Sequence, residues 1–185
     1  MAKLGREIVV TLANGRALRV RDARSRDARP LTRLLDAVAA EPEVTLLLLP
    51  GEATAREWRS RISSVASARC ALLLVACVDG ELVGNLGIWP DANPASAHVG
   101  WLGMSVDRHW RGMGVGGTLL EIAMEWAAAT GCVRAALGVF PHNERAISFY
   151  EHHGFMREGV RRAQYRRRGE YHDEVLMARI LTALP

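Results

Sequence analysis

A glycine-rich run that opens a helix constrains the fold of this chain more than any other stretch. The run is Arg111-Gly112-Met113-Gly114-Val115-Gly116-Gly117, and the apolar residues 99–106 before it are typical of a strand. After it, apolar side chains recur at helical spacing, at Val115, Leu119, Ile122 and Trp126. The first N–H groups of a helix lack partners within the helix, and the helix dipole favours negative charge there. The segment therefore indicates an anion-binding site, with Arg111 adding a positive charge at its rim.

The spacing of the glycines narrows the choice of anion. The run lacks the Gly-x-x-x-x-Gly-Lys-Ser/Thr pattern of nucleoside-triphosphate-binding loops. It also lacks the complete Gly-x-Gly-x-x-Gly of a dinucleotide-binding fold, and no acidic residue is placed to hold a ribose. The pattern that remains is Arg-x-x-Gly-x-Gly over residues 111–116. Taken alone, this pattern is also compatible with a tight strand-to-helix turn that binds nothing.

A second pattern lies downstream and has the form Asn-x-x-Ala-x-x-x-Tyr-x-x-x-Gly-Phe. Its residues are Asn143, Ala146, Tyr150, Gly154 and Phe155. Together with the glycine-rich run, this segment resembles the GNAT superfamily of N-acetyltransferases, and the resemblance covers roughly residues 16–181. The stretch Gly169-Glu170-Tyr171-His172-Asp173-x-x-x-Met177 is similar to a bacterial branch of that family, which acetylates amino acids or N-terminal amines.

The resemblance implies both a fold and an activity. The expected fold is α/β, with a mixed, mostly antiparallel sheet that splays at its centre and about four flanking helices. One domain over residues 1–185 is expected, with residues 1–15 as an extra N-terminal strand and a core over about 16–181. The implied activity is direct transfer of the acetyl group of acetyl-CoA to a primary amine in a ternary complex. The amine would belong to an amino acid, a small amine or a protein N-terminus.

The resemblance also implies which residues bind acetyl-CoA. The glycine-rich run would hold the pyrophosphate, and the strand before it would bond the amides of the pantetheine arm. Asn143 can cap its helix and can also bond that arm. The full set of residues expected to bind the cofactor is Met104, Ser105, Val106, Arg111, Gly112, Met113, Gly114, Val115, Gly116, Gly117, Asn143 and Ala146.

Two residues are candidates for proton transfer. In the family the tyrosine at the position of Tyr150 protonates the departing thiolate of coenzyme A, and a phenol is protonated at pH 7. The alternative for Tyr150 is a core aromatic side chain. His98 begins the central strand and could accept the amine proton, since histidine titrates near neutral pH. The alternative for His98 is an exposed histidine at a strand end.

Patterns along the chain predict the order of elements. Asn14-Gly15 between apolar runs predicts a hairpin, and a continuous apolar run at 70–78 predicts a strand buried on both faces. Strands are expected at 8–12, 17–20, 70–78, 81–89, 98–106, 133–139, 155–162 and 171–181. Helices are expected at 27–41, 54–65, 115–130 and 143–153, and residues 43–51 are expected to form an irregular loop.

Composition excludes several classes of protein. No apolar run approaches the roughly 20 residues that span a bilayer, and residues 1–7 lack a signal-peptide core, so a cytoplasmic protein without a membrane partner is expected. Cys70, Cys77 and Cys132 lie in apolar surroundings and are predicted to be buried free thiols. His109, His142, His152 and His153 follow no ligand spacing, so no metal is expected. A homodimer is left open, because the sequence does not set the oligomeric state.

A cluster of arginines supports a second hypothesis. Arg161, Arg162, Arg166, Arg167 and Arg168 could contact phosphates in a non-catalytic module that binds coenzyme A or RNA. A hairpin with a solvated charged face is the commoner case, and the net charge of +4 is weak support for nucleic acid. The loops 43–53 and 161–172 are expected to choose the acceptor, and Tyr171 and Asp173 either line its pocket or end a solvated strand.

Overall fold

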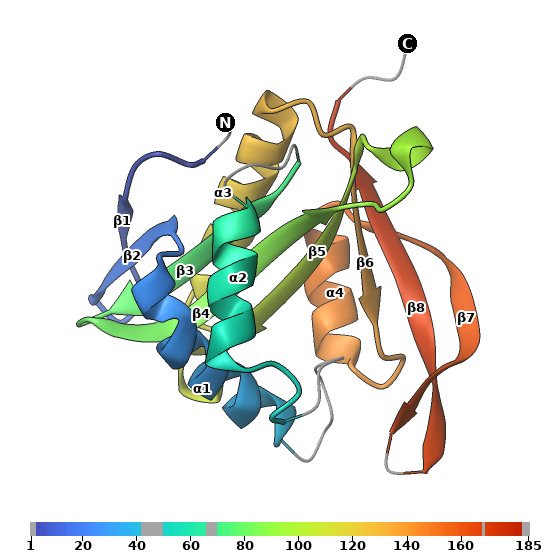
Figure 1. Cartoon of the computed structure of the whole chain (residues 1–185), viewed down its shortest axis with the longest axis horizontal. Coiled ribbons are helices and arrows are strands. Elements are labelled where there is room, and N and C mark those ends of the chain that lie inside the picture. Colours follow the sequence, from blue (N-terminus) through green and yellow to red (C-terminus); the bar gives the residue numbers. More distant parts are fainter. Residues whose placement is uncertain (1–2, 42–49, 66–69, 168, 183–185) are drawn as a thin grey trace.

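The computed structural model describes residues 3–41, 50–65, 70–167 and 169–182. The strands in these ranges are β1 (Ile8–Thr11), β2 (Ala17–Asp22), β3 (Leu72–Val78), β4 (Glu81–Pro90), β5 (Val99–Val106), β6 (Arg134–Val139), β7 (Met156–Arg167) and β8 (Glu170–Ile180). The α-helices are α1 (Ala28–Ala39), α2 (Ala55–Val65), α3 (Val115–Ala129) and α4 (Glu144–His152). This order of strands and helices confirms the predicted order (Figure 1). Of the predicted loop 43–51, residues 43–49 lie outside the described ranges.

Across the described residues, eight strands form one sheet in the order β1-β2-β3-β4-β5-β6-β8-β7. Its neighbouring strands are antiparallel except for β5 and β6, which are parallel, so the predicted mixed, mostly antiparallel sheet is confirmed. The β5–β6 pairing ends at Trp101 opposite Ala136, although both strands continue beyond that point. The sheet therefore splays at its centre, as expected, and a gap opens between the C-terminal halves of β5 and β6.

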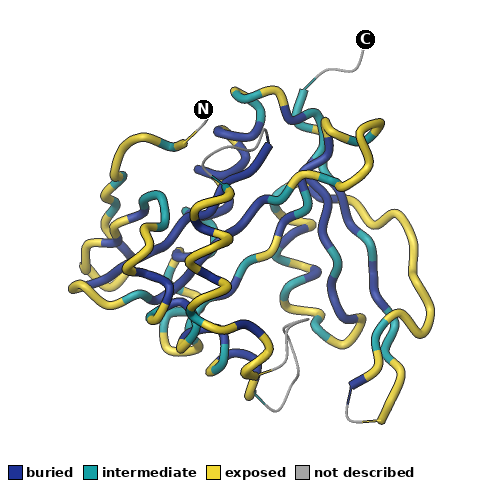
Figure 2. Tube along the Cα trace, in the orientation of Figure 1, coloured by how far each residue is buried: buried dark blue, intermediate teal, exposed yellow. Residues whose placement is uncertain are grey.

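Helices cover both faces of this sheet. The larger core cluster packs α3 and α4 against one face and includes Leu102, Leu119 and Tyr150. The smaller cluster packs α1 and α2 against the other face through Leu31, Trp58 and neighbouring apolar residues. Figure 1 shows α1 and α2 over the near face of the sheet. The outer strand β7 stays exposed along most of its length (Figure 2).

The last hairpin is longer than the sequence predicts. β7 continues to Arg167 rather than ending near residue 162, because Tyr165, Arg166 and Arg167 pair with residues at the start of β8. Two register shifts interrupt the pairing, one between Arg157 and Gly159 and one between Arg161 and Tyr165. These shifts place residues of one strand on faces that a simple alternation does not predict.

The prediction of three free thiols is wrong. Cys70, just before β3, and Cys132, just after α3, form a disulfide across a sequence separation of 62 residues. Cys77 is buried, and it is the free cysteine among the described residues. Within the described ranges, no helix combines the length and the apolar composition needed to cross a membrane.

Candidate active site

The glycine-rich loop between β5 and α3 has the backbone that its sequence requires. Gly112 and Gly114 have φ angles of 78° and 96°, which place them in the left-handed region that favours glycine. Gly114 is the N-cap of α3, so the unpaired N–H groups of the first helical turn follow it directly. Because Gly112, Gly114, Gly116 and Gly117 all border a large cavity, these N–H groups and the helix dipole create an anion site at its wall.

The cavity has a volume of about 870 Å³ and collects residues from five parts of the chain. Its wall includes Met104, Ser105 and Val106, which belong to the part of β5 that lies beyond its pairing with β6. α1 contributes Val38, and Glu41 lies two residues beyond its end. The loop after β5 contributes Arg108, and α4 contributes Arg145, Ala146, Phe149 and Tyr150. The cavity therefore follows the splayed end of β5 and ends at the N-terminus of α3.

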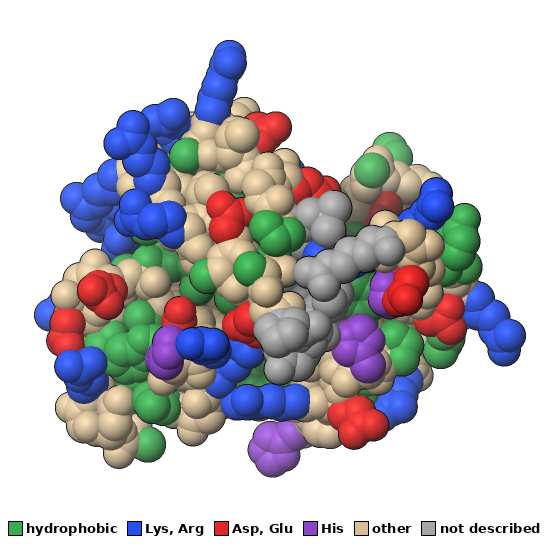
Figure 3. Space-filling view, turned by 90° about the horizontal axis from the view of Figure 1, so that it is seen from below, with side chains coloured by type: hydrophobic (Ala, Val, Ile, Leu, Met, Phe, Trp, Pro, Cys, Tyr) green, Lys and Arg blue, Asp and Glu red, His purple; other side chains and the backbone are tan. Residues whose placement is uncertain are grey.

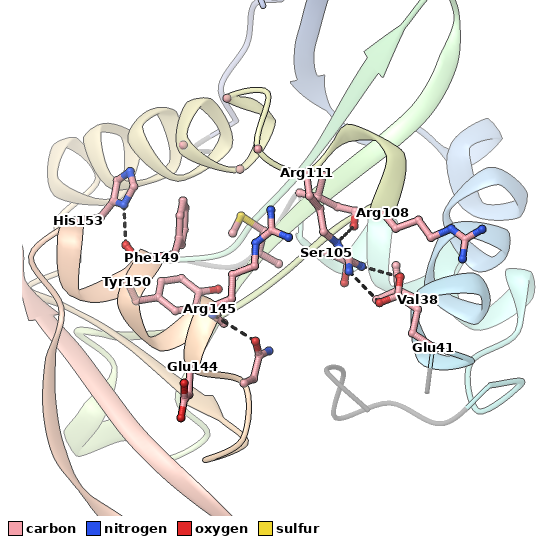
Figure 4. A pocket seen from close by; sticks show the side chains of 18 of the residues that line it. Val38, Glu41, Ser105, Arg108, Arg111, Glu144, Arg145, Phe149, Tyr150 and His153 are labelled. Atoms are coloured by element: carbon pink, nitrogen blue, oxygen red, sulfur yellow. Dashed lines mark hydrogen bonds and ion pairs between the residues drawn. The ribbon is translucent and has the colours of Figure 1, made fainter. Parts of the chain in front are cut away.

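Arg111 lines the cavity, but a carboxylate matches its charge. Arg111 pairs with Glu41 through two contacts of 2.8 and 2.6 Å, and its Nε donates to the Val106 carbonyl at 2.9 Å. Its charge is thus matched by a carboxylate, and it holds the loop against β5. Arg108 and Arg145 also line the cavity, and Figure 4 shows Arg145 reaching into it from α4. Sequence reasoning missed both, because arginines beside a motif are common on surfaces.

Basic and apolar groups lie close together on this side of the molecule. Figure 3 shows blue Lys and Arg side chains and purple His side chains beside green apolar surface on the underside of the fold. A ligand that carries phosphate at one end and an apolar chain at the other matches such a surface. Among the described residues, no group of three or more His, Cys, Asp or Glu side chains is placed to hold a metal ion.

Tyr150 is a buried side chain with its hydroxyl directed into the cavity (Figure 4). Its ring makes edge contacts with Phe149 and Phe155, at centroid distances of 5.3 and 5.5 Å. Burial raises the pKa of Tyr150, so the phenol stays protonated at neutral pH. Asn143 caps α4 by accepting a hydrogen bond from Ala146 N at 3.2 Å, which confirms the predicted cap. The structure thus brings the two sequence motifs into one cavity.

Three residues predicted for the site do not line this cavity. The sulfur of Met113 accepts from the Asn14 side chain at 3.3 Å, and Val115 is buried in the core below the loop. His98 is exposed before the start of β5, and about 20 Å of extended strand separates it from Met104. The backbone carbonyl of His98 accepts from Val133 N at 2.9 Å. The structure therefore does not bring His98 to the cavity, and the candidate base has to be sought elsewhere.

The arginine cluster does not form one phosphate-binding surface among the described residues. Arg161 contacts Glu174 at 3.3 Å, Arg166 lies over the Tyr171 ring, and Arg167 is buried with its guanidinium over Phe140. Arg162 is exposed, and Arg168 lies outside the described residues. Of the two possible acceptor-pocket residues, Tyr171 is 68% exposed. Asp173 accepts from Ala163 N at 2.8 Å and so supports the backbone of the hairpin.

Comparison with known proteins settles the family. Residues 34–155, which include both motifs, match the family described as Acetyltransferase (GNAT) family. This chain belongs to the GNAT acetyltransferase family. It is 32% identical over 167 residues to the L-amino acid N-acetyltransferase AaaT of Escherichia coli (strain K12), and the match covers 87% of this chain and 96% of that protein.

Solved structures support the same assignment of the fold. A GNAT-family acetyltransferase from Streptococcus pneumoniae superposes with a TM-score of 0.80 and 29% identity, covering 88% of this chain and 98% of that one. The acetyltransferase yncA from Salmonella typhimurium, solved with its cofactor acetyl-CoA, superposes with a TM-score of 0.82 at 15% identity. That match covers 91% of this chain and 96% of that one. The GNAT fold thus covers about nine tenths of this chain.

Proposed function

We propose that this GNAT enzyme transfers the acetyl group of acetyl-CoA directly to a primary amine, with both substrates bound together. The observation that carries the proposal is that the glycine-rich loop and the Tyr150 hydroxyl face the same cavity. The cavity runs along β5 where that strand has separated from β6. A thioester can therefore lie at the strand gap while the phosphates of the same molecule lie on the loop.

The residues of the cavity fit the parts of acetyl-CoA. The N–H groups at the start of α3 suit the pyrophosphate, and Arg108 and Arg145 supply positive charge that no described carboxylate pairs with at short range. The main chain of residues 104–106 can bond the amides of pantetheine on its side away from β4, since this stretch no longer pairs with β6. Asn143 keeps its role as the cap of α4 and presents its side chain at the same wall.

The chemistry needs two proton transfers besides the new bond. An ammonium group first loses a proton, so that its nitrogen lone pair attacks the thioester carbon and forms the C–N bond. When the C–S bond breaks, Tyr150 gives its hydroxyl proton to the sulfur of coenzyme A. The phenolate then recovers a proton from the nitrogen, which becomes the neutral amide. The raised pKa of Tyr150 keeps the proton in place until a thiolate forms beside it.

Two further parts of the proposal concern the protein in the cell. We place the enzyme in the cytoplasm, where acetyl-CoA is used.

We also propose a homodimer, in which a second copy of the chain covers the exposed side of the last hairpin. Val160 on β7 and Tyr171 on β8 lie on the same face of this hairpin and are more than half exposed, at 56% and 68%. A second copy of the chain would remove this apolar surface from water. Sedimentation of the purified protein measures its oligomeric state.

The proposed phosphate site is tested by thermal unfolding with acetyl-CoA. The wild-type protein should gain about 5–10 °C in Tm at a hundredfold excess over Kd, because the ligand binds the folded state alone. Gly114→Glu should lose this gain, since it brings a side chain and a negative charge to the start of α3. Gly80→Glu is the matched control, because Gly80 has φ of 85° in the open β3–β4 turn and does not line the cavity. An equal gain in all three proteins would contradict the assignment of the loop.

A further inference from the structure

A second, smaller cavity lies beside the strand gap and takes no part in the site described so far. Its volume is about 280 Å³, which suits one small molecule. Its wall includes Trp89 on β4, Trp101 on β5, Gly138 on β6, and Arg161, Tyr165 and Glu174 from the last hairpin. The wall of this small cavity thus combines two tryptophan rings with one positive and one negative side chain.

The second cavity opens on the face of the sheet opposite to α3 and α4. Leu137 and Val139 of β6 pack in the core cluster that holds α3. Because side chains alternate along a strand, Gly138 between them faces the other way. Trp89 packs against the cluster formed by α1 and α2, which covers that same opposite face. The two cavities therefore lie on the two sides of the splayed sheet and share β5, whose residues 101–103 line the smaller cavity and 104–106 the larger one.

The carboxylate of Glu174 reaches the strand gap because residue 138 is a glycine. Glu174 is on β8, and β6 lies between β8 and the gap (Figure 1). A Cβ at position 138 would lie 2.6 Å from the carboxyl carbon of Glu174, which is closer than real atoms approach. The Glu174 side chain therefore passes over the β6 backbone at the one point where no side chain stands in its way. Its own exposed fraction is 4%, so a charged group is held in a nearly dry site.

Two hydrogen bonds hold this carboxylate in place. The Tyr165 hydroxyl donates to one oxygen at 2.9 Å, and Arg161 Nη1 donates to the other at 3.3 Å. Burial, followed by the hydrogen bond to Glu174, raises the pKa of Tyr165 to about 12, so the hydroxyl remains the donor at neutral pH. A carboxylate has about four acceptor sites, and these two bonds use half of them. The remaining sites can accept N–H groups from a ligand in the cavity.

Arg161 presents the opposite charge at the mouth of the same cavity. Its side chain is 45% exposed, and its guanidinium lies 5.8 Å from the centre of the Trp101 ring. The Trp101 ring is itself held by a hydrogen bond of 2.8 Å from its Nε1 to Asp91. Of the five N–H donors of the guanidinium, one is directed at Glu174, which leaves others for a second carboxylate. The planar fork of Arg is well suited to that partner.

We propose that this cavity binds the acceptor as a free α-amino acid, with the ammonium group on Glu174 and the carboxylate on Arg161. An α-amino acid carries both charges on one carbon, which matches a carboxylate and a guanidinium that lie side by side. The inference rests on the proposed function, because the amine must reach a thioester held at the strand gap from the other face. The apolar walls formed by Trp89 and Trp101 suit an apolar side chain.

Glu174 then has a chemical role as well as a binding role. It takes one proton from the bound ammonium group, and the freed lone pair forms the C–N bond with the thioester carbon. The C–S bond breaks, and the sulfur receives the Tyr150 proton as described above. Glu174 returns its proton to solvent when the amide leaves. Glu174 thus replaces His98 as the candidate base, because its carboxylate lies beside the gap.

The test compares L-leucine with L-leucinamide as acceptors. For each, the rate of acetyl transfer is measured as the rate at which the free thiol of coenzyme A appears. The two probes differ in the carboxylate, which the amide lacks, so leucinamide also represents a peptide N-terminus. The wild-type enzyme should favour leucine in kcat/KM by on the order of 10- to 100-fold, the usual effect of a charge-assisted hydrogen bond. Arg161→Gln should lose that preference, because the value for leucine falls further than the value for leucinamide, which loses only the support that Arg161 gives to Glu174. Arg162→Gln is the matched control, since Arg162 is an exposed neighbour outside the cavity.

A second pair of variants tests the carboxylate. Glu174→Gln keeps the shape of the side chain and should lower kcat for both probes by on the order of 10²-fold. Glu81→Gln, at an exposed glutamate that begins β4 and lines neither cavity, should leave both rates unchanged. The Tm shift with acetyl-CoA should stay the same in every variant, which shows that the cofactor cavity is intact.

Three outcomes overturn this inference, and they are distinct from failure of the proposed function. A leucine preference that survives Arg161→Gln contradicts the binding of a carboxylate by Arg161. Wild-type enzyme that favours leucinamide contradicts a free amino acid as acceptor, while acetyl transfer itself stands. An unchanged kcat in Glu174→Gln contradicts its role as base. Failure of acetyl-CoA to shift the wild-type Tm would instead overturn the proposed function, and this inference with it.

Discussion

At the scale of single residues, the hydroxyl of Tyr150 can be removed without changing the packing of its ring. Its ring is held by Phe149 and Phe155, and these contacts involve no hydrogen bond of the hydroxyl. A phenylalanine at position 150 would keep the ring and its contacts. The role proposed for the hydroxyl can therefore be tested without disturbing the fold.

Tyr150→Phe should lower the single-turnover rate of acetyl transfer by on the order of 10²-fold, because the thiolate loses its proton donor. The Kd for acetyl-CoA and the Tm should change little. Tyr171→Phe removes a hydroxyl from a 68% exposed ring and should change neither value. A wild-type rate in Tyr150→Phe would show that the tyrosine is a core residue, and a lost affinity would show that its hydroxyl binds the cofactor.

Gly138 provides a second prediction at this scale. Gly138→Ala should displace the Glu174 carboxylate from the strand gap, because the new Cβ would occupy its place. We expect a loss of kcat/KM for the amine, while the affinity for acetyl-CoA on the other face of the sheet is unchanged. Stability should fall by about 1–3 kcal/mol, the usual cost of overpacking.

The control for this prediction is Gly159→Ala on β7. A Cβ at position 159 would meet no atom within 4 Å, so the same substitution is free of any clash there. Activity and stability should stay close to those of the wild type. If Gly138→Ala behaves like Gly159→Ala in both assays, the side chain of Glu174 does not depend on the glycine beneath it.

At the scale of elements, α1 is held at both of its ends by an ion pair. Just before its N-terminus, Asp27 accepts two hydrogen bonds from Arg21 of β2, at 2.6 and 3.0 Å. Just beyond its C-terminus, Glu41 pairs with Arg111 of the glycine-rich loop. The helix thus connects the outer part of the sheet to the wall of the cofactor cavity. Both of its attachments are ion pairs with little exposure to solvent.

The pair at the N-terminus of α1 predicts how stability depends on pH. Burial by itself would raise the pKa of Asp27, but the hydrogen bonds from Arg21 and from Arg24 N outweigh it and lower that pKa. A lowered pKa contributes stability above the unfolded value near 3.9, and this contribution is lost as the pH falls through the folded value. Asp27→Asn should therefore cost about 1–3 kcal/mol at pH 7, because a mostly buried guanidinium loses its partner.

Urea unfolding at several pH values checks this prediction. The free-energy difference between wild type and Asp27→Asn should be constant near neutral pH and should shrink below about pH 4. Glu7→Gln is the control, because its pair with Arg19 is exposed, at 38% and 56%, and should contribute little. A difference that is independent of pH down to pH 2 would contradict the role of the Asp27 charge.

At the scale of the whole molecule, a disulfide joins the two central layers. Cys70 lies just before β3 and Cys132 lies just after α3, so the bridge connects the sheet to the helix whose N-terminus is the proposed phosphate site. When the protein is denatured without reduction, one thiol should react, that of Cys77. After reduction, three thiols should react. Reduction should lower the free energy of unfolding by about 2–4 kcal/mol.

Thiol titration in denaturant, with and without prior reduction, checks this prediction. Three reactive thiols in protein purified without reductant would show that the cysteines stay reduced, which is the usual state in a cytoplasm. Cys77→Ala is a useful control, since it removes the free thiol and should leave none in the unreduced protein.

Much of this protein is determined by patterns short enough to be read in the sequence. The order of strands and helices, the cap at Asn143 and the turn in the glycine-rich loop all depend on neighbours within a few residues. Backbone angles and helix caps are local properties, so the residues that form them can be recognised without the fold. The splayed sheet could be expected as well, but through resemblance to a known family.

Only the tertiary structure decided which distant groups meet. The partner of Arg111 is 70 positions away, the bridged cysteines are 62 apart, and Glu174 lies over Gly138 because β8 is the neighbour of β6. His98 directly precedes the strand that holds Met104, yet the length of that strand keeps the histidine out of the cavity. Such contacts depend on the order, spacing and splay of strands. These are properties of the assembled sheet, and no short segment of the chain carries them.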